Sequence, residues 1–413
     1  MLPNQYTHNI VIKNTDEMLI NTVIETGMSI TGYRQIKSNH INNSNPKQII
    51  IPGLINLHSH LAYSDTRLKS QSLFPWISQL VEIHHMGEAG LPSAALKGAQ
   101  EALSFGTSFL IDNTSHPEDS IKAFQKSGLK GIIGIEIFGS DPKQAAQILK
   151  QNLERINKLN KPTNIDLTLS PHASYDVSPQ LWQLCLNWCN QNHTPLLSHL
   201  AESAEEEAWL QDKDSHQARS AREFWDKINT LTTKLQNWQS YPSSTQYLHK
   251  HNLLKPFSLF THLVHAKKQD LELIKAAGIG IITCPRSNLY LKNGLANYQQ
   301  WQKLGLDFAV GTDSKASNSD LDLRKEANAI PGLNAKARFE LISNKAAKLL
   351  KRKDLGSLDI GKAADWVVLE LQDQNIDLKT ADLFELIMDT EMTIVKEVYI
   401  DGICRYDKVH AKV

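Results

Sequence analysis

The sequence has few cysteines, no net charge and no long hydrophobic run, and each absence excludes a class of protein. Four cysteines among 413 residues are too few for a small disulfide-stabilised secreted scaffold. Basic and acidic residues both number 44, so no net field attracts nucleic acid or an anionic membrane. No segment approaches the roughly 18 apolar residues of a membrane-spanning helix, and the N-terminus lacks a secretory signal pattern. We therefore expect a cytoplasmic protein whose partner is a small molecule.

Two of the cysteines raise a metal-binding alternative. Cys185 and Cys189 lie four residues apart, and His193 follows them. No second ligand pair lies nearby in the sequence, so the segment LWQLCLNWCNQ is better explained as a helix with a buried face.

The central part of the chain repeats a short apolar run, a polar turn and a longer helical stretch, which is typical of βα units. Eight such runs occur, at residues 54–57, 107–111, 131–137, 165–169, 195–198, 258–261, 279–283 and 307–310. Eight parallel strands with intervening helices close naturally into a barrel, whose functional groups lie at the carboxyl ends of the strands. The sequence therefore predicts an α/β fold with a (β/α)8 TIM barrel over residues 51–351.

Both ends of the chain differ from this pattern. Short alternating stretches such as NIVIKN, DWVVLEL and KEVYIDG predict one small β-sandwich domain composed of residues 1–50 and 352–413. The polar and aromatic stretch 212–252 extends the loop after the fifth strand, where a substrate lid can form.

The first apolar run ends in a histidine pair. In PGLINLHSHLAYSD, His58 and His60 are two residues apart, so on a strand both imidazoles point to the same side. The pair alone does not distinguish metal ligation from two structural histidines. Its position favours ligation, because further metal-competent side chains end later runs: His172, His199, His262 and Asp313.

Four of these side chains form a suitable ligand set for one cation. His58, His60, His199 and Asp313 supply three nitrogens and a carboxylate, which suits Zn²⁺ and also accommodates Fe²⁺ or Mn²⁺. Such a cation lowers the pKa of water to about 7. Asp313 would also receive a proton from the attacking water, although an aspartate here can equally cap the next helix. The run IDLTLSPHA lacks a lysine that could bridge two metal ions, so we expect a single metal ion.

Glu202 is the candidate general acid and base. It follows His199 by three residues in SHLAESAEEE, a spacing that places both side chains on one face of a first helical turn. The alternative is a solvated acid at a helix start, favoured by the helix dipole. We prefer that alternative for the three acids Glu205, Glu206 and Glu207, but not for Glu202.

Two histidines in FTHLVHAKK follow the sixth run. His262 ends the run, so we expect it beside the attacking water. His265 lies further into the loop, where a supporting or structural role is expected.

At this point the sequence resembles the amidohydrolase superfamily, in the branch that contains triazine chlorohydrolases, guanine deaminase and S-adenosylhomocysteine deaminase. The resemblance spans nearly the whole chain. It is carried by PGLINLHSH, SPHASYDVSP, SHLAES, THLVH, TCPRSNLYLKNG, VGTDSKASNSDLDL and GSLDIGKAADWVVLEL.

The resemblance implies roles for individual residues. His58, His60, His199 and Asp313 would hold one metal, while Glu202 and His262 would serve proton transfer and transition-state stabilisation. His172 and Ser317 would reach the substrate, which the branch implies is a purine nucleoside-type molecule. The oligomeric state, monomer or homodimer, stays open.

The segments LFPWISQLVEIHH, CPRSN and TDSKASNSDLDL resemble the chlorohydrolase-like proteins that deaminate 6-amino-6-deoxyfutalosine in menaquinone biosynthesis. Arg286, in CPRSN, is suited to a bidentate pair with the benzoate of that substrate. An ion pair that braces the loop is an equal alternative for this arginine. Deamination of S-adenosylhomocysteine or methylthioadenosine, hydrolysis with another leaving group, and a non-catalytic scaffold are the competing functions; the complete ligand set disfavours the scaffold.

Overall fold

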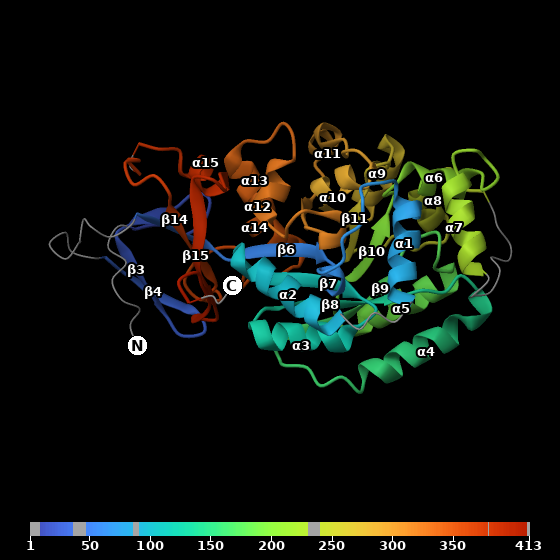
Figure 1. Ribbon diagram of the computed structural model, residues 1–413, viewed down its shortest axis with the longest axis horizontal. Coiled ribbons are helices and arrows are strands. Elements are labelled where there is room, and N and C mark those ends of the chain that lie inside the picture. Colours follow the sequence, from blue (N-terminus) through green and yellow to red (C-terminus); the bar gives the residue numbers. More distant parts are fainter. Residues whose placement is uncertain (1–8, 36–46, 86–90, 230–239, 379, 411–413) are drawn as a thin grey trace.

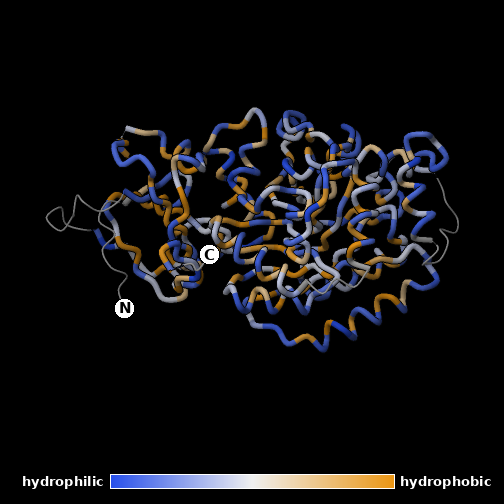
Figure 2. The backbone as a smooth tube through the Cα atoms, in the orientation of Figure 1, coloured by the Kyte–Doolittle hydropathy of each residue, from blue (hydrophilic) through white to orange (hydrophobic). Residues whose placement is uncertain are grey.

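The computed structural model describes residues 9–35, 47–85, 91–229, 240–378 and 380–410. The strands form two groups that lie next to each other along the long axis of the molecule, and most helices surround the larger group (Figure 1). Hydrophobic residues follow the strands inside the molecule, whereas α4 on its surface alternates hydrophobic and hydrophilic residues (Figure 2). No helix in the described ranges is long and apolar enough to cross a membrane.

The larger group consists of eight parallel strands in two sheets of four, with the orders β6-β7-β8-β9 and β10-β11-β12-β13. Their bounds are β6 (Leu54–Ser59), β7 (Thr107–Thr114), β8 (Lys130–Ile137), β9 (Ile165–Pro171), β10 (Leu196–Leu200), β11 (Ser258–His262), β12 (Gly280–Thr283) and β13 (Phe308–Val310). Isolated parallel bridges, Ser59 to Asp313 and Ala173 to His199, connect the two sheets at both junctions. Each apolar run predicted from the sequence overlaps one of these strands, and the α/β fold is confirmed.

Helices connect and cover these strands. Their bounds are α1 (Leu73–His85), α2 (Leu91–Ser104), α3 (Pro117–Ser127), α4 (Ala145–Ile156), α5 (Pro179–Gln191), α6 (Ala204–Gln211), α7 (Arg219–Asn229), α8 (Ser244–Lys250), α9 (Lys268–Ala276), α10 (Pro285–Tyr290), α11 (Tyr298–Leu304), α12 (Leu323–Asn328), α13 (Ala335–Leu341), α14 (Asn344–Leu349) and α15 (Leu383–Met388). Short 3-10 turns add η2 (Leu61–Tyr63), η3 (Pro142–Gln144) and η4 (Lys315–Ser317).

Helix α5 illustrates how the sequence sets these elements. It begins where Ser178 accepts a hydrogen bond from the Leu181 amide and Pro179 occupies the first turn, a position that needs no amide donor. Cys185 and Cys189 lie on its buried face as free thiols. The interpretation of this segment as a buried helix face is confirmed.

The smaller group of strands is built from both ends of the chain. A six-stranded sheet has the order β16-β15-β14-β5-β1-β2, and β3 and β4 form a separate hairpin. The bounds are β1 (Asn9–Ile12), β2 (Met18–Ile20), β3 (Thr22–Thr26), β4 (Ile30–Gln35), β5 (Gln48–Pro52), β14 (Trp366–Leu371), β15 (Thr393–Ile400) and β16 (Ile403–Asp407). Val11, Ile50 and Trp366 of the sheet share one hydrophobic cluster with Ile30 of the hairpin.

A buried ion cluster ties the two groups of strands together. Lys130 opens β8 in the larger group, and its Nζ lies 2.8 Å from Asp365 Oδ2 and 2.7 Å from Asp401 Oδ1 in the smaller group. Lys130 and Asp365 are both 5% exposed. Burial raises the pKa of Asp365 although the positive charge of Lys130 opposes the shift. Each charge is therefore tolerated in the interior because its partner is present.

We predict that Lys130→Met lowers the free energy of unfolding by about 3 kcal/mol, because the variant leaves the buried carboxylate of Asp365 without a cation. Urea unfolding measures the change. The matched control is Lys348→Met, because Lys348 pairs with Asp307 at 2.8 Å while both side chains are more than half exposed. The control should change stability by at most about 1 kcal/mol. Equal losses in the two variants would show that burial of the cluster does not matter.

Candidate active site

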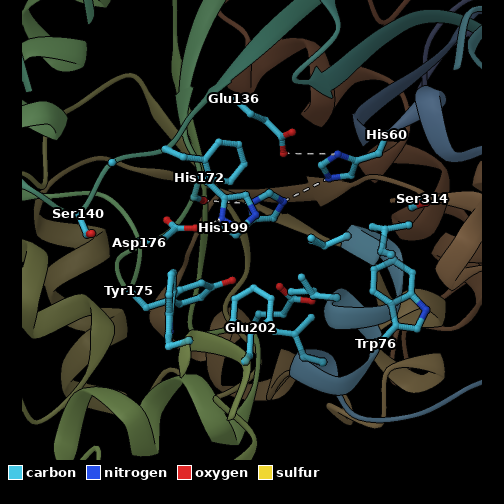
Figure 3. Close-up of a pocket in the computed structure, with 18 of the residues that line it drawn as sticks. His60, Trp76, Glu136, Ser140, His172, Tyr175, Asp176, His199, Glu202 and Ser314 are labelled. Carbon is cyan, nitrogen blue, oxygen red and sulfur yellow. Dashed lines mark hydrogen bonds and ion pairs between the residues drawn. The ribbon is translucent and has the colours of Figure 1, made fainter. Parts of the chain in front are cut away.

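A pocket of about 970 Å³ lies at the carboxyl ends of the parallel strands. Metal-competent and acidic side chains from these ends point into it, as Figure 3 illustrates for His60, Glu136, His172, His199 and Glu202. Parallel strands of an α/β fold bring their carboxyl ends to one side, so residues far apart in sequence meet here.

Three histidines form the centre of the site. His58 and His60, at the end of β6, and His199 in β10 place their ligand nitrogens within 4.8 Å of one another. The Nε2 atoms of His60 and His199 are 3.3 Å apart. His58 Nε2 is buried and has no hydrogen-bond partner among the described residues. The second nitrogen of the other ring, His60 Nδ1, lies 3.7 Å from Glu136 Oε1. A buried imidazole nitrogen without a hydrogen-bond partner, beside two further imidazoles, fits a bound cation.

The outer nitrogens of two of these histidines are held in place. His199 Nδ1 lies 3.0 Å from the carbonyl oxygen of His172. His58 Nδ1 lies 2.9 Å from the side-chain amide of Asn113 in β7. Such contacts fix the ring orientation of a metal ligand. Burial lowers the pKa of His58 and lowers that of His199 well below its usual value, so both rings are neutral, the form that binds metal.

Asp313 completes the predicted ligand set. Its Oδ1 lies 3.6 Å from His58 Nε2 and 3.7 Å from His60 Nε2. Ser287 Oγ donates to Oδ2 at 2.5 Å, and the Ser314 amide donates to Oδ1 at 2.7 Å. Although burial alone would raise the pKa of Asp313, the contact with His58 and the nearby histidines hold it well below its usual value. Its φ of +59° lies in the left-handed region, a strained backbone for a non-glycine residue.

Glu202 and His262 face each other beside the histidines. Glu202 Oε2 lies 3.5 Å from His262 Nε2, and Asn293 Nδ2 donates to Glu202 Oε1 at 3.4 Å. His262 Nδ1 lies 2.8 Å from Asn288 Oδ1. Burial, with the charge of Asp313, raises the pKa of Glu202 well above its usual value, and burial lowers the pKa of His262 to about 4. The pair therefore couples a carboxyl group that readily holds a proton to a neutral imidazole.

The local structure around Glu202 corrects two expectations. Helix α6 begins at Ala204 with Ser203 as its cap, so Glu202 precedes the helix instead of lying on its first turn. Glu206 and Glu207 are 0% and 6% exposed, so their interpretation as solvated acids is wrong. Glu206 accepts hydrogen bonds from the Ala201 and Glu202 amides, and Glu207 accepts from Ser244. Backbone and hydroxyl donors that the sequence does not reveal compensate the burial of these acids.

His172 lines the pocket, as expected. Its Nδ1 lies 2.5 Å from Asp176 Oδ2. Burial would lower the pKa of His172, but the charge and hydrogen bond of Asp176 raise it to about 9. The sequence analysis missed Asp176, Tyr175 and Glu136, which also line the pocket. The spacing of four residues between His172 and Asp176 in PHASYD was the available signal.

Arg286 and Ser317 are not among the residues that line the pocket. Arg286 lies 2.8 Å from Asp320 Oδ1 and 3.9 Å from Glu326 Oε1. This geometry favours the loop-bracing ion pair over a contact with a substrate carboxylate. Ser317 Oγ lies 2.7 Å from Ser287 Oγ and 3.5 Å from Asp313 Oδ2. Its hydroxyl group therefore contacts the carboxylate of Asp313 and the serine that donates to it.

His265 has a supporting contact. Its Nε2 lies 3.1 Å from the carbonyl oxygen of Asn293, whose side chain contacts Glu202. The stretch predicted to form a lid contributes Phe224 and Trp225 of α7 to the pocket wall. Residues 230–239 of that stretch lie outside the described residues.

Comparisons with known proteins identify the family of this chain. The model of the amidohydrolase family matches residues 49–404. A 5-methylthioadenosine/S-adenosylhomocysteine deaminase of Carboxydothermus hydrogenoformans is 24% identical, in an alignment that covers 94% of this chain and 93% of the relative. An aminodeoxyfutalosine deaminase of Deinococcus radiodurans is 27% identical, in an alignment that covers 69% of each chain.

Solved structures share the fold. Helicobacter pylori aminofutalosine deaminase, in complex with methylthio-coformycin, superposes with a TM-score of 0.79 at 19% identity, covering 96% of this chain and 98% of that one. A zinc-bound adenosine deaminase from Xanthomonas campestris gives a TM-score of 0.74 at 20% identity, covering 96% and 91%. The family match extends over most of the chain, and family members are metal-dependent hydrolases that act on carbon–nitrogen bonds. The chain therefore belongs to the amidohydrolase family and is a hydrolase of this kind.

Proposed function

We propose that this protein is a mononuclear metal-dependent aminohydrolase that replaces the exocyclic amine of an adenine-type ring by oxygen and releases ammonia. One observation carries the proposal. His58, His60, His199 and Asp313 converge beside the Glu202–His262 pair, and all of these side chains except His58 line one pocket. Three nitrogens and a carboxylate favour zinc, and iron or manganese are the alternatives.

The residues present fit one divalent cation. The buried Nε2 of His58, which has no hydrogen-bond partner among the described residues, lies 3.6 Å from the ionised Asp313, and a cation between such groups would satisfy both. When bound, such a cation lowers the pKa of water from 15.7 to about 7, which makes a nucleophile available at neutral pH.

Glu202 and His262 are suited to the proton transfers of deamination. Glu202 Oε2 would take a proton from the attacking water and deliver it to the amine, which then leaves as ammonia while the ring carbon gains an oxygen. His262 lies 3.5 Å from the same carboxyl oxygen, where a neutral imidazole can stabilise the developing charge. Asn293 restrains the other oxygen of Glu202, which keeps the shuttle aligned.

Glu206 positions this shuttle. Its Oε2 accepts from the Glu202 amide at 2.8 Å, and its Oε1 accepts from the Ala201 amide at 3.2 Å. Ala201 has a φ of +50°, so the link between His199 and Glu202 is bent into the left-handed region. The buried carboxyl group of Glu206 stabilises this bend by accepting the two backbone hydrogen bonds.

For the natural substrate we propose 6-amino-6-deoxyfutalosine, a step of menaquinone biosynthesis. Support comes from the motif resemblance and from the Deinococcus relative with that named activity. 5-Methylthioadenosine or S-adenosylhomocysteine is the second candidate, supported by the Carboxydothermus relative. The ultraviolet shift from adenine to hypoxanthine, measured with each compound, tests the proposal and ranks the candidates; no shift with any of them would contradict it.

We also infer that the two parallel sheets form one closed (β/α)8 barrel over residues 51–351. The paired bridges at both sheet junctions support this inference. The strands of residues 1–50 and 352–413 would then form a separate β-sandwich domain.

Removal of the metal should abolish turnover, because water alone is too weak an acid to supply the nucleophile at neutral pH. Treatment with a chelator and His199→Ala should each eliminate measurable deamination, and added Zn²⁺ should restore only the chelated wild type. Metal content and ammonia release measure the effect. The control is His249→Ala, which changes an exposed histidine of α8 and should leave metal content and ammonia release unchanged. Full activity of a metal-free preparation would contradict the mechanism.

Glu202→Gln should retain the metal and bind substrate nearly normally, while kcat falls by about 10² to 10⁴. The amide preserves the shape of the side chain but cannot carry the proton. Single-turnover kinetics and metal analysis measure the two effects separately. Loss of metal in this variant would instead identify Glu202 as a ligand.

Glu206→Leu should lower kcat by about ten- to a hundredfold with little change in KM or metal content, because a small displacement of Glu202 misaligns the proton transfer. Glu206→Gln should recover part of the rate, since its amide oxygen can still accept from the Glu202 amide whereas its NH2 group cannot accept from the Ala201 amide. Glu205→Gln, on the same turn and outside the pocket lining, is the matched control. A loss in the control as large as in Glu206→Leu would argue against a positioning role.

A further inference from the structure

The pocket has two chemically different sides. The groups proposed for catalysis come from strand ends, whereas a set of apolar side chains comes from two helices. We define the apolar wall as Trp76, Ile77 and Val81 of α1 together with Phe224 and Trp225 of α7, all of which line the pocket. The two helices lie side by side (Figure 1).

The apolar wall is backed by packed aromatic rings. The ring centroids of Phe224 and Trp225 are 5.2 Å apart, and Phe74 lies 5.6 Å from Phe224. Tyr175 lies 6.1 Å from Trp225 and 5.9 Å from His172, so the aromatic contacts continue to the catalytic floor. Rings held in this way form a preshaped surface, which binds a flat apolar group with little loss of conformational entropy.

The size of the pocket leaves room for a substituent. Its volume of about 970 Å³ is at the upper end of the roughly 300 to 1,000 Å³ that ligand pockets occupy. The carbon that bears the amine must approach Glu202 and His262 at the strand ends. The remainder of the molecule then extends away from the floor, and the helices α1 and α7 border that space.

No lysine or arginine is among the described residues that line the pocket. His172, whose pKa is raised to about 9, is already paired with Asp176 at 2.5 Å. Glu136, Asp176 and Glu202 lie near the floor, and Asp141 lies at the loop before η3. On that loop Phe138 is 46% exposed, and its ring centroid lies 4.8 Å from that of His172. A substrate carboxylate in this part of the pocket would meet Asp141 and a histidine that Asp176 already neutralises, whereas an uncharged ring would meet further aromatic surface.

Resting on the proposed function, we propose that the apolar wall is the subsite for the group attached to the 5′ carbon of the nucleoside. It selects an aryl ring by apolar contact, and a carboxylate on that ring contributes little to recognition. Substrate specificity at this position is therefore determined by shape and hydrophobicity and not by an ion pair.

The test compares kcat/KM of the zinc-loaded enzyme for four nucleosides: 5′-deoxyadenosine, 5′-methylthioadenosine, 5′-phenylthioadenosine and 5′-(3-carboxyphenylthio)adenosine. The phenylthio compound should exceed 5′-deoxyadenosine by at least about tenfold, since even one methylene in an apolar pocket changes kcat/KM by roughly 10- to 200-fold. The carboxylated compound should stay within about threefold of its uncharged counterpart. A tenfold gain from the carboxylate, or no advantage of the phenyl group, would overturn the proposal.

Two variants of α1 test whether the apolar wall causes the preference for the phenylthio compound. Ile77→Ala should lower the ratio of kcat/KM for the phenylthio compound to that for 5′-deoxyadenosine by about tenfold, because the half-buried side chain loses its contact with the ring. Gln79→Ala changes an exposed residue of the same helix that does not line the pocket, so the ratio should not change. An unchanged ratio in both variants would overturn the assignment of the wall.

The result also separates this inference from the proposed function. If none of the four nucleosides is deaminated by the metal-loaded enzyme, the proposed function fails. If all four are deaminated with equal efficiency, the function stands and only the subsite assignment is overturned.

Discussion

The ionised carboxylate of Asp313, buried among imidazoles, is the interaction on which the site depends. A charge in the interior is costly unless it is paired, and here hydrogen bonds from Ser287 and Ser314 and the nearby rings of His58 and His60 compensate it. The strained backbone of Asp313 and the support of Ser317 behind it follow from the need to hold that charge in one position.

The histidines depend on the same constraint. Burial lowers the pKa of His58 and of His199, so both imidazoles stay neutral and can serve as metal ligands without adding positive charge. Contacts with the side-chain amide of Asn113 and the carbonyl of His172 fix the outer nitrogens and direct the inner ones toward one point. The parallel strands supply the rigid frame for this convergence, and the buried cluster of Lys130 and Asp365 anchors that frame to the sheet formed by the chain ends.

The groups proposed for proton transfer and substrate selection lie on other elements. Glu202 is held by a bent backbone segment and by the buried carboxyl group of Glu206, so its position does not depend on a regular helix. The apolar wall lies on α1 and α7, which connect the strands but do not belong to the sheets. Chemistry at strand ends and selectivity on connecting helices can therefore change independently, as expected for a fold that hosts many reactions.

The sequence by itself determined the repeating strands, the α/β fold and the candidate ligands, because hydrophobic period and the position of polar residues after apolar runs are local properties. His58, His60, His199 and Asp313 were identifiable in this way, and the structure brings them together. Tertiary structure alone decided the environment of the acids and of Arg286. Glu206 and Glu207 are buried and accept hydrogen bonds from the amides of Ala201, Glu202 and Ser244. Arg286 forms ion pairs with Asp320 and Glu326. A charged side chain carries no local signal of its partner, since that partner is fixed only when distant loops meet.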